Sequence, residues 1–280
     1  MFDVRKEAVI GFYDTHPINE DEILARVKAA GKDPESITED DLKEFDQDHY
    51  GGIGAVDLLA EMAGISLHHH VLDVCSGMGG PARWIAHRIG CRVTGLDFTR
   101  SRVEGARRLT RRAGLGDLVD FIQGDATDMS LPDSRYDAVI GQEAWVHIAD
   151  KSALIGECAR VVKALGVIAF TDIVARTVLG DNEQARLATE MQFPRVDSAA
   201  TYVRLLAEHR CSVESCEDLS EGWTAVLVGR LEMYRSLRET TVAKFGEQRY
   251  VEYDRAYSHF VSLFAAGRLG GVRVVARRAD

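Results

Sequence analysis

The sequence predicts an α/β fold with a doubly wound, mostly parallel sheet of seven strands. Between residues 71 and 174, short apolar runs alternate with helical patterns, which is typical of parallel strands joined by crossover helices. The chain has 280 residues, of which 46% are hydrophobic and 28% charged, with 25 glycines and 5 prolines. This composition is that of a globular protein and excludes a disordered, collagen-like or coiled-coil chain.

The strands and helices can be placed along the chain. Strands are expected at 71–74, 91–96, 119–123, 136–141, 167–173, 211–217 and 271–276. Helices are expected at 81–89, 101–113, 151–163 and 197–209. Pro81 falls in the first turn of its helix, where the missing N–H costs nothing. Asp197 or Ser198 is expected to cap the last helix.

Two further segments are predicted to be helical and to stand outside the sheet. About fifty residues, 219–270, separate the last two strands and show helical periodicity, whereas a loop in such a fold has about 2–6 residues. Residues 1–60 are also helical, with a break at Gly51 and Gly52. We therefore expect a helical cap or lid at 1–60, a core at 61–218 and 271–280, and an inserted helical subdomain at 219–270.

Charge and cysteine content bear on partners and location. A net charge of -10 argues against a nucleic-acid partner, because affinity for phosphate backbones comes from Lys and Arg. The five cysteines are irregularly spaced without a Cys-x-x-Cys motif, so reduced, structural thiols are expected, Cys211 and Cys216 among them. No apolar run approaches ~20 residues and the start lacks a signal-peptide core. We expect a cytoplasmic protein without a membrane partner; a homodimer is left open.

A glycine-rich turn joins the first strand to the first helix. Gly77 and Gly79 let a ligand approach the backbone, and the helix N-terminus offers free N–H groups to an anion. Residues 77–82 also satisfy the G-x-G-x-x-A dinucleotide fingerprint. An NAD-dependent oxidoreductase is therefore an alternative.

Three acids lie at the carboxyl ends of successive predicted strands and border one crevice. Asp73 enters the glycine-rich turn, Asp97 ends the second strand, and Asp125 follows the third. Asp97 stands where an acid that binds ribose hydroxyls is expected. A pyrophosphate would gain nothing from Asp73, whereas an ammonium group would. The acids therefore suit a ligand with an amine, a ribose and an adenine.

In order and spacing, residues 71–80, 94–97, 124–126 and 136–139 resemble the motifs of class I S-adenosylmethionine-dependent methyltransferases. Residues 157–166 look like the helix and turn before that family's fifth strand, although Cys75 replaces a usual glycine and Ala164 a usual proline. The resemblance implies a Rossmann-like fold, S-adenosyl-L-methionine as cofactor with S-adenosyl-L-homocysteine as product, and no metal. The implied cofactor-binding residues are Tyr50, Asp73, Cys75, Gly77, Gly79, Asp97, Phe98, Asp125, Ala126 and Gln142.

A closer resemblance adds an acceptor. Residues 49–52, 142–147 and 266–271 look like segments of sarcosine/dimethylglycine N-methyltransferases, which implies N-methylation of a small amine or amino acid. His147 is then the candidate catalytic residue, as a base or as a positioning group. The candidate acceptor-binding residues are Glu143, Trp145, Arg176 and Arg195. A larger apolar natural-product or lipid-like acceptor, and a scaffold without activity, are left open.

For some of these residues, a structural role is the alternative to a role in binding or catalysis. Tyr50 and Trp145 could pack in the core. The histidines at 68–70 are expected in a solvated turn, the acidic stretch 33–48 on a solvated helix face, and the basic helix 100–112 in surface salt bridges. Residues 219–270 and 1–60 are expected to cover the crevice and form the acceptor pocket, because the sheet needs neither segment and both carry aromatic residues: Phe12, Tyr13, Tyr50, Trp223, Tyr234, Tyr250, Tyr253, Tyr257 and Phe260.

Overall fold

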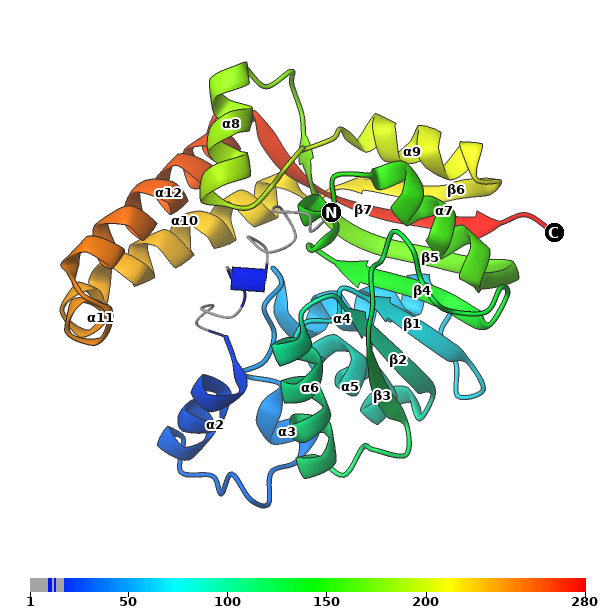
Figure 1. Cartoon of the computed structure of the whole chain (residues 1–280), viewed down its shortest axis with the longest axis horizontal. Coiled ribbons are helices and arrows are strands. Elements are labelled where there is room, and N and C mark those ends of the chain that lie inside the picture. Colours follow the sequence, from blue (N-terminus) through cyan, green and yellow to red (C-terminus); the bar gives the residue numbers. More distant parts are fainter. Residues whose placement is uncertain (1–9, 12, 14–17) are drawn as a thin grey trace.

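The computed structural model describes residues 10, 11, 13 and 18–280 (Figure 1); Phe12 lies outside them. Within this part of the chain, seven strands form one sheet in the order β3-β2-β1-β4-β5-β7-β6. Only β7 runs antiparallel to its neighbours. The predicted fold class is confirmed. The strands are β1 (His70–Val74), β2 (Arg92–Asp97), β3 (Val119–Gln123), β4 (Tyr136–Gln142), β5 (Val162–Ala175), β6 (Cys211–Asp218) and β7 (Leu269–Arg278).

Helices cover both faces of the sheet because successive side chains of a strand point to opposite faces. In β1, Val71 packs with α4 (Gly52–Met62), α5 (Gly80–Ile89) and α6 (Arg100–Arg112). Leu72 and Val74 pack with α7 (Lys151–Val161) and α9 (Ala199–Glu208). The cap was predicted to extend to residue 60, whereas Val56 and Leu59 of α4 lie in the core of the sheet.

Two groups of helices extend beyond the sheet (Figure 1). The first consists of α2 (Glu20–Ala29) and α3 (Glu39–Leu42), which lie beside α6 and α5. The second consists of α10 (Ser220–Ser236), α11 (Arg238–Phe245) and α12 (Glu247–Ala265), with α10 and α12 packed side by side. Together with α8 (Asp181–Glu190), the second group has its own apolar cluster around Trp223, Leu227 and Phe260.

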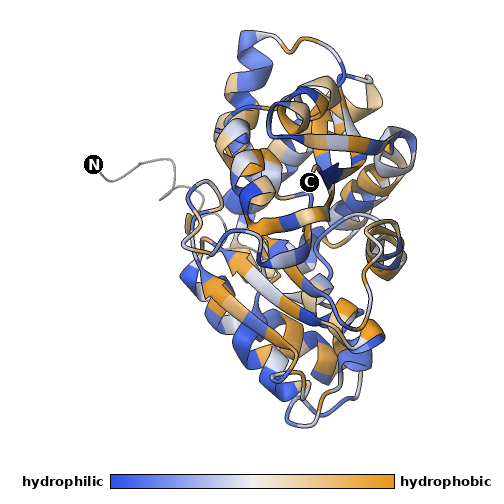
Figure 2. Cartoon of the chain, turned by 90° about the vertical axis from the view of Figure 1, so that its right-hand side faces the viewer, coloured by the Kyte–Doolittle hydropathy of each residue, from blue (hydrophilic) through white to orange (hydrophobic). Residues whose placement is uncertain are grey.

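Hydropathy follows this arrangement (Figure 2): the strands are largely apolar, and hydrophilic residues are frequent on the outer helices and loops. In the part of the chain that the structure describes, no helix is long and apolar enough to cross a membrane.

Several element boundaries differ from prediction. β5 begins at Val162 because this residue pairs with Tyr136, and α7 therefore ends at Val161. The helix α8 was not predicted. Ser198 caps α9 by accepting the N–H of Thr201, as one of the two expected caps. β6 contains Cys211 and Cys216, and these thiols are free.

Three predictions of solvated charge hold only in part. Surface ion pairs of Arg100, Arg108 and Arg112 and the exposed turn at His68 agree with them, whereas other residues of each group pack inside the protein. In the acidic stretch, Glu39 and Asp46 are buried and form ion pairs with Arg83. In the basic helix, Arg102 is buried and donates to the carbonyls of Ile18 and Tyr13. Among the three histidines, His70 belongs to β1, and its ring packs on Tyr136. In each case distant residues supply the partners, which local sequence does not show.

Candidate active site

The turn between β1 and α5 adopts left-handed backbone conformations at three positions: Cys75 with φ 66°, Gly77 with φ 53° and Gly79 with φ 79°. A Cβ atom on Gly79 would lie 2.4 Å from the ring of Phe121, so this position requires glycine. Cys75 shows that its own position accepts a side chain, at a strain of about 1–2 kcal/mol. Replacement of the family's glycine therefore preserves the turn.

Asp97 connects the end of β2 to this turn. Its Oδ2 atom accepts the N–H of Gly77 at 2.8 Å, and its Oδ1 atom accepts the N–H of Thr99 at 2.8 Å. Burial raises the pKa of Asp97, although the two N–H groups oppose that shift. Each carboxylate oxygen has a further lone pair, so Asp97 can still accept hydrogen bonds from a ligand.

Unpaired polar atoms gather beside this turn. Asp73 Oδ2, Ser76 Oγ and both amide atoms of Gln142 are buried without a hydrogen-bond partner in the described structure. Burial and the nearby Asp97 raise the pKa of Asp73 to about 7. Buried polar groups are normally hydrogen-bonded, so this cluster fits a polar ligand that carries a cation toward Asp73.

The remaining cofactor candidates lie at the ends of β2 and β3. Asp125 Oδ1 accepts from the N–H and the hydroxyl of Thr127 at 2.9 Å and 2.7 Å. The carbonyl of Phe98 accepts from Gln123 at 3.2 Å, and Ala126 is buried in the core. These residues therefore flank Asp97 on one edge of the sheet.

The segment after β4 brings Glu143 against the cap. The N–H of Glu143 donates to the Thr171 carbonyl at 2.7 Å, and its Oε2 atom accepts the N–H of Tyr50 at 2.5 Å. Burial raises the pKa of Glu143 well above its usual value. The ring of Tyr50 packs edge-on against Trp223 of α10, with centroids 5.0 Å apart. Tyr50 thus joins the cap to both the sheet and the insertion.

Trp145 is a core residue. Its side chain is completely buried and stacks on Phe170, with ring centroids 4.3 Å apart. Its indole Nε1 donates to the Val74 carbonyl at 3.3 Å. The structural alternative therefore holds for Trp145, and its predicted contact with the acceptor has no support in this geometry.

His147 follows in the short 3-10 helix η1 (Trp145–His147) and contacts two distant segments. Its Nδ1 atom lies 3.0 Å from the Gln192 carbonyl, and its Nε2 atom lies 2.9 Å from the Tyr13 hydroxyl. A carbonyl can only accept, so Nδ1 carries the proton and Nε2 accepts the hydroxyl proton of Tyr13. The pair forms a hydrogen-bonded donor and acceptor at the carboxyl edge of the sheet.

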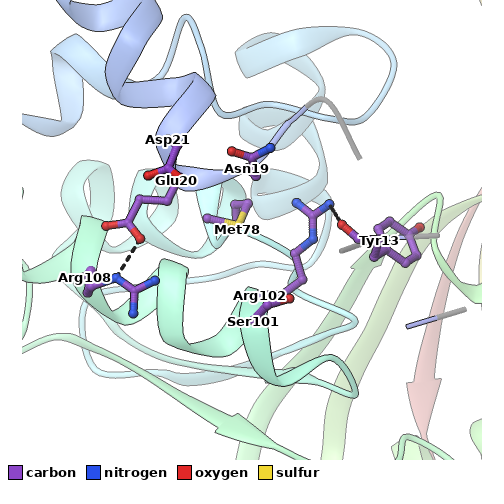
Figure 3. A pocket seen from close by; sticks show the side chains of 8 residues that line it. All are labelled: Tyr13, Asn19, Glu20, Asp21, Met78, Ser101, Arg102 and Arg108. Carbon is purple, nitrogen blue, oxygen red and sulfur yellow. Dashed lines mark hydrogen bonds and ion pairs between the residues drawn. The ribbon is translucent and has the colours of Figure 1, made fainter. Parts of the chain in front are cut away.

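No site role was predicted for Tyr13 by itself. Its aromatic ring and its place in the cap were the only signals in the sequence that pointed to it. Burial, with Asp48 and Asp97 nearby, raises the pKa of its phenol. Arg102 holds the backbone of Tyr13 by donating to its carbonyl at 2.8 Å. Figure 3 shows this contact in a pocket of about 280 Å³. The lining residues are Tyr13, Asn19, Glu20, Asp21, Met78, Ser101, Arg102 and Arg108.

The two arginines expected to bind an acceptor are engaged elsewhere. Arg176 pairs with Asp218 at 3.2 Å, and its side chain is 45% exposed. Arg195 pairs with Asp197 at 2.9 Å, and its side chain is 68% exposed. Neither presents a buried fork to the residues around His147. In the described residues, no three His, Cys, Asp or Glu side chains are grouped to hold a metal ion.

Comparison with known proteins agrees with this geometry. Residues 72–170 match the family model of the methyltransferase domain. The chain is 30% identical over 195 residues to glycine/sarcosine/dimethylglycine N-methyltransferase from Actinopolyspora halophila, covering 70% of this chain and 34% of that protein. The chain therefore contains a class I S-adenosylmethionine-dependent methyltransferase domain. The predicted family and cofactor are confirmed.

Other relatives of the methyltransferase domain differ in acceptor. A sterol 24-C-methyltransferase from Eremothecium gossypii is 42% identical over 116 residues, which are 41% of this chain and 31% of that protein. A candidate sarcosine dimethylglycine methyltransferase from Galdieria sulphuraria shares the fold with a TM-score of 0.76 and 21% identity, covering 93% of this chain and 98% of that one. The chain spans about a third of the length of the two curated relatives.

The residues present fit S-adenosyl-L-methionine. Asp97 would receive the ribose hydroxyls, and the open space beside Gly77 would admit the ligand to the backbone, whereas Gly79 packs against Phe121. The unpaired Asp73 Oδ2, Ser76 Oγ and Gln142 amide suit the ammonium and carboxylate of its methionine end. The ligand therefore supplies partners that the protein alone lacks.

Proposed function

We propose that the chain is a methyltransferase for a small molecule, and that it methylates the nitrogen of a small amine or amino acid such as sarcosine or dimethylglycine. The observation that carries this proposal is the hydrogen bond between Tyr13 and His147. This hydrogen bond joins the N-terminal segment to the residues after β4, at the sheet edge where the proposed cofactor residues lie. The names of the sarcosine-directed relatives support the choice of acceptor.

Methyl transfer requires little covalent participation by the protein. When bound, the sulfonium cofactor offers a methyl group to a nucleophile, and the residues around it must hold the acceptor in line. A protonated amine has no lone pair and must lose its proton first. Tyr13 can take that proton on its oxygen while it passes its own to His147 Nε2. The Gln192 carbonyl at Nδ1 then stabilises the imidazolium.

The cap and the insertion would exclude water from this site. In the described structure, Lys244 of α11 pairs with Glu22 of α2 at 2.5 Å, so the two outer groups meet. Arg230 of α10 donates to the His49 carbonyl at 3.0 Å. We propose that the segments expected at 1–60 and 219–270 form the acceptor pocket together, with residues 52–60 serving the core instead.

A larger apolar acceptor is the second candidate. Buried apolar side chains of the insertion, of α8 and of the segment after α8 form one cluster beside His147, and the ring of Phe193 in that segment lies 5.0 Å from that of His147. A sterol 24-C-methyltransferase and the methyltransferase GfsG from Streptomyces halstedii are among the relatives. An apolar wall of this kind would suit a bulky acceptor as well as it suits the methyl groups of a small amine.

An acceptor panel tests the proposal. Release of S-adenosylhomocysteine is measured with glycine, sarcosine, dimethylglycine, phosphoethanolamine and hydroxylated aromatics. Turnover of sarcosine or dimethylglycine is expected. Turnover of bulky acceptors alone would replace the amine with the second candidate. Calorimetric titration with S-adenosylhomocysteine and with NAD completes the test, since tight NAD binding without a response to adenosylhomocysteine would support the oxidoreductase alternative.

A further inference from the structure

Arg230 is the arginine of the insertion that faces the cap. It lies on α10, and its Nη2 atom donates to the His49 carbonyl at 3.0 Å. Its guanidinium carbon lies 4.8 Å from the centre of the Tyr50 ring. Among the described residues no carboxylate lies within ion-pair distance of it. A half-buried guanidinium that retains N–H donors without a counterion is suited to bind an anion.

Hydroxyl groups on α12 share this surface. Tyr253 and Tyr257 stack with ring centroids 5.5 Å apart, and Arg230 lies near enough to lower the pKa of both phenols, although burial raises them overall. Both phenols therefore keep their protons at neutral pH and can donate hydrogen bonds to the same anion. Arg230 and these tyrosines come from helices that pack side by side.

Glu143 places a carboxyl group on the other side of Tyr50. Its carboxylate accepts the Tyr50 N–H at 2.5 Å, while the guanidinium of Arg230 covers the Tyr50 ring. The two groups influence each other, since Arg230 opposes the rise in the pKa of Glu143, yet they form no ion pair in the described structure. A ligand that carries both an ammonium and an anionic group can bridge these two side chains, because an ammonium beside Glu143 favours the ionised form of its carboxyl.

We propose that Arg230, with the hydroxyls of Tyr253 and Tyr257, binds the anionic group of the methyl acceptor, and that Glu143 faces its amine. This assignment rests on the proposed function and replaces Arg176 and Arg195, which pair with Asp218 and Asp197. The acceptor is accordingly a small amine that bears a carboxylate or a phosphate. Both anions match a guanidinium fork, and the experiment separates them.

The test compares acceptors with and without the anion. Initial rates are measured for sarcosine against sarcosinamide, and for phosphoethanolamine against ethanolamine, in the wild type and in Arg230→Gln. We expect Arg230→Gln to raise KM for the preferred anionic acceptor by roughly 10- to 100-fold, the effect of losing charge-assisted hydrogen bonds. KM for its neutral counterpart and the dissociation constant of S-adenosylhomocysteine should stay unchanged. Arg230→Lys should recover part of the loss.

Arg235→Gln is the matched control, since Arg235 lies on the same helix but pairs with Asp254. An equal loss for charged and neutral acceptors would overturn the assignment and point to displacement of the His49 contact instead. Calorimetric titration of sarcosine and phosphoethanolamine into the complex with S-adenosylhomocysteine gives a readout without turnover. Absence of binding by both, or equal affinity in Arg230→Gln, would also overturn it. Failure of the wild type to bind S-adenosylhomocysteine would instead refute the proposed function.

Discussion

The guanidinium of Arg83 lies 2.7 Å from the carboxylate of Asp46, and both side chains are fully buried. Arg83 also pairs with Glu39 at 3.1 Å and donates to the Met78 carbonyl at 2.8 Å. Glu39 and Asp46 belong to the cap, and Met78 belongs to the glycine-rich turn. Arg83 therefore connects the cap to the glycine-rich turn, which is the proposed cofactor site.

Loss of Arg83 should destabilise the fold. Arg83→Met would leave two buried carboxylates without their counterion, and we expect unfolding to become easier by about 3–5 kcal/mol. Urea denaturation followed by circular dichroism measures the change. Arg108→Met is the control, because Arg108 and Glu20 form a partly exposed pair that should be worth less than about 1 kcal/mol. Equal losses of stability in the two variants would mean that burial does not strengthen the ion pairs of Arg83.

Asp97 should dominate cofactor affinity. Asp97→Ala removes the predicted ribose contacts and also the acceptor for the N–H groups of Gly77 and Thr99. We expect S-adenosylhomocysteine to bind roughly 10- to 150-fold more weakly, as for loss of one charge-assisted hydrogen bond. Calorimetry measures this, with the exposed Asp117→Ala as control. An unchanged dissociation constant for Asp97→Ala would place the cofactor elsewhere.

Cofactor binding should depend on pH through Asp73. Its pKa is raised to about 7, first by burial and then by Asp97, whereas an ammonium group beside it favours the ionised form. Below pH 7 the ligand must therefore displace a proton, and its dissociation constant should rise by up to about tenfold per pH unit. Titrations at pH 6, 7 and 8 measure the slope. Asp73→Asn should bind weakly at every pH, and a slope that survives in this variant would assign the titration to another group.

Tyr13 and His147 should act as a unit. Tyr13→Phe and His147→Ala each remove the route for the acceptor proton, and each should lower kcat by roughly 100-fold or more. The double variant should lose little beyond either single one, since coupled groups are not additive. Steady-state rates with sarcosine give these values. Tyr136→Phe, in a core tyrosine that packs on His70, should keep the wild-type rate. Multiplicative losses in the double variant would argue for independent roles.

Closure of the cap should be visible by hydrogen exchange. The contacts of Tyr50 with Glu143 and Trp223 link the cap to both sides of the crevice. Adding S-adenosylhomocysteine should slow exchange at residues 18–50 and 220–265 as well as in the sheet. Protection restricted to residues 71–174 would contradict a closing lid.

Sequence reasoning succeeded where the signal is local. The alternation of apolar runs and helices predicted all seven strands, and Asp73 and Asp97 lie in the last positions of β1 and β2 as expected. The helix α8 was not predicted, because its sequence has no strong helical periodicity. The positions of Arg176 and Arg195 after β5 were also read correctly, but whether their charges face the site depends on Asp218 and Asp197.

The sequence by itself determined the sheet, the glycine-rich turn and the methyltransferase family, because periodicity, turn chemistry and short motifs each lie within one stretch of chain. Only the tertiary structure decided which charges are buried and which side chains meet. Arg83 finds Asp46 across 37 residues and Tyr13 finds His147 across 134, and no local pattern encodes such partners. The acidic stretch was predicted to be solvated, but its buried acids pair with Arg83 and so hold the cap in place, since a charge removed from water must be paired.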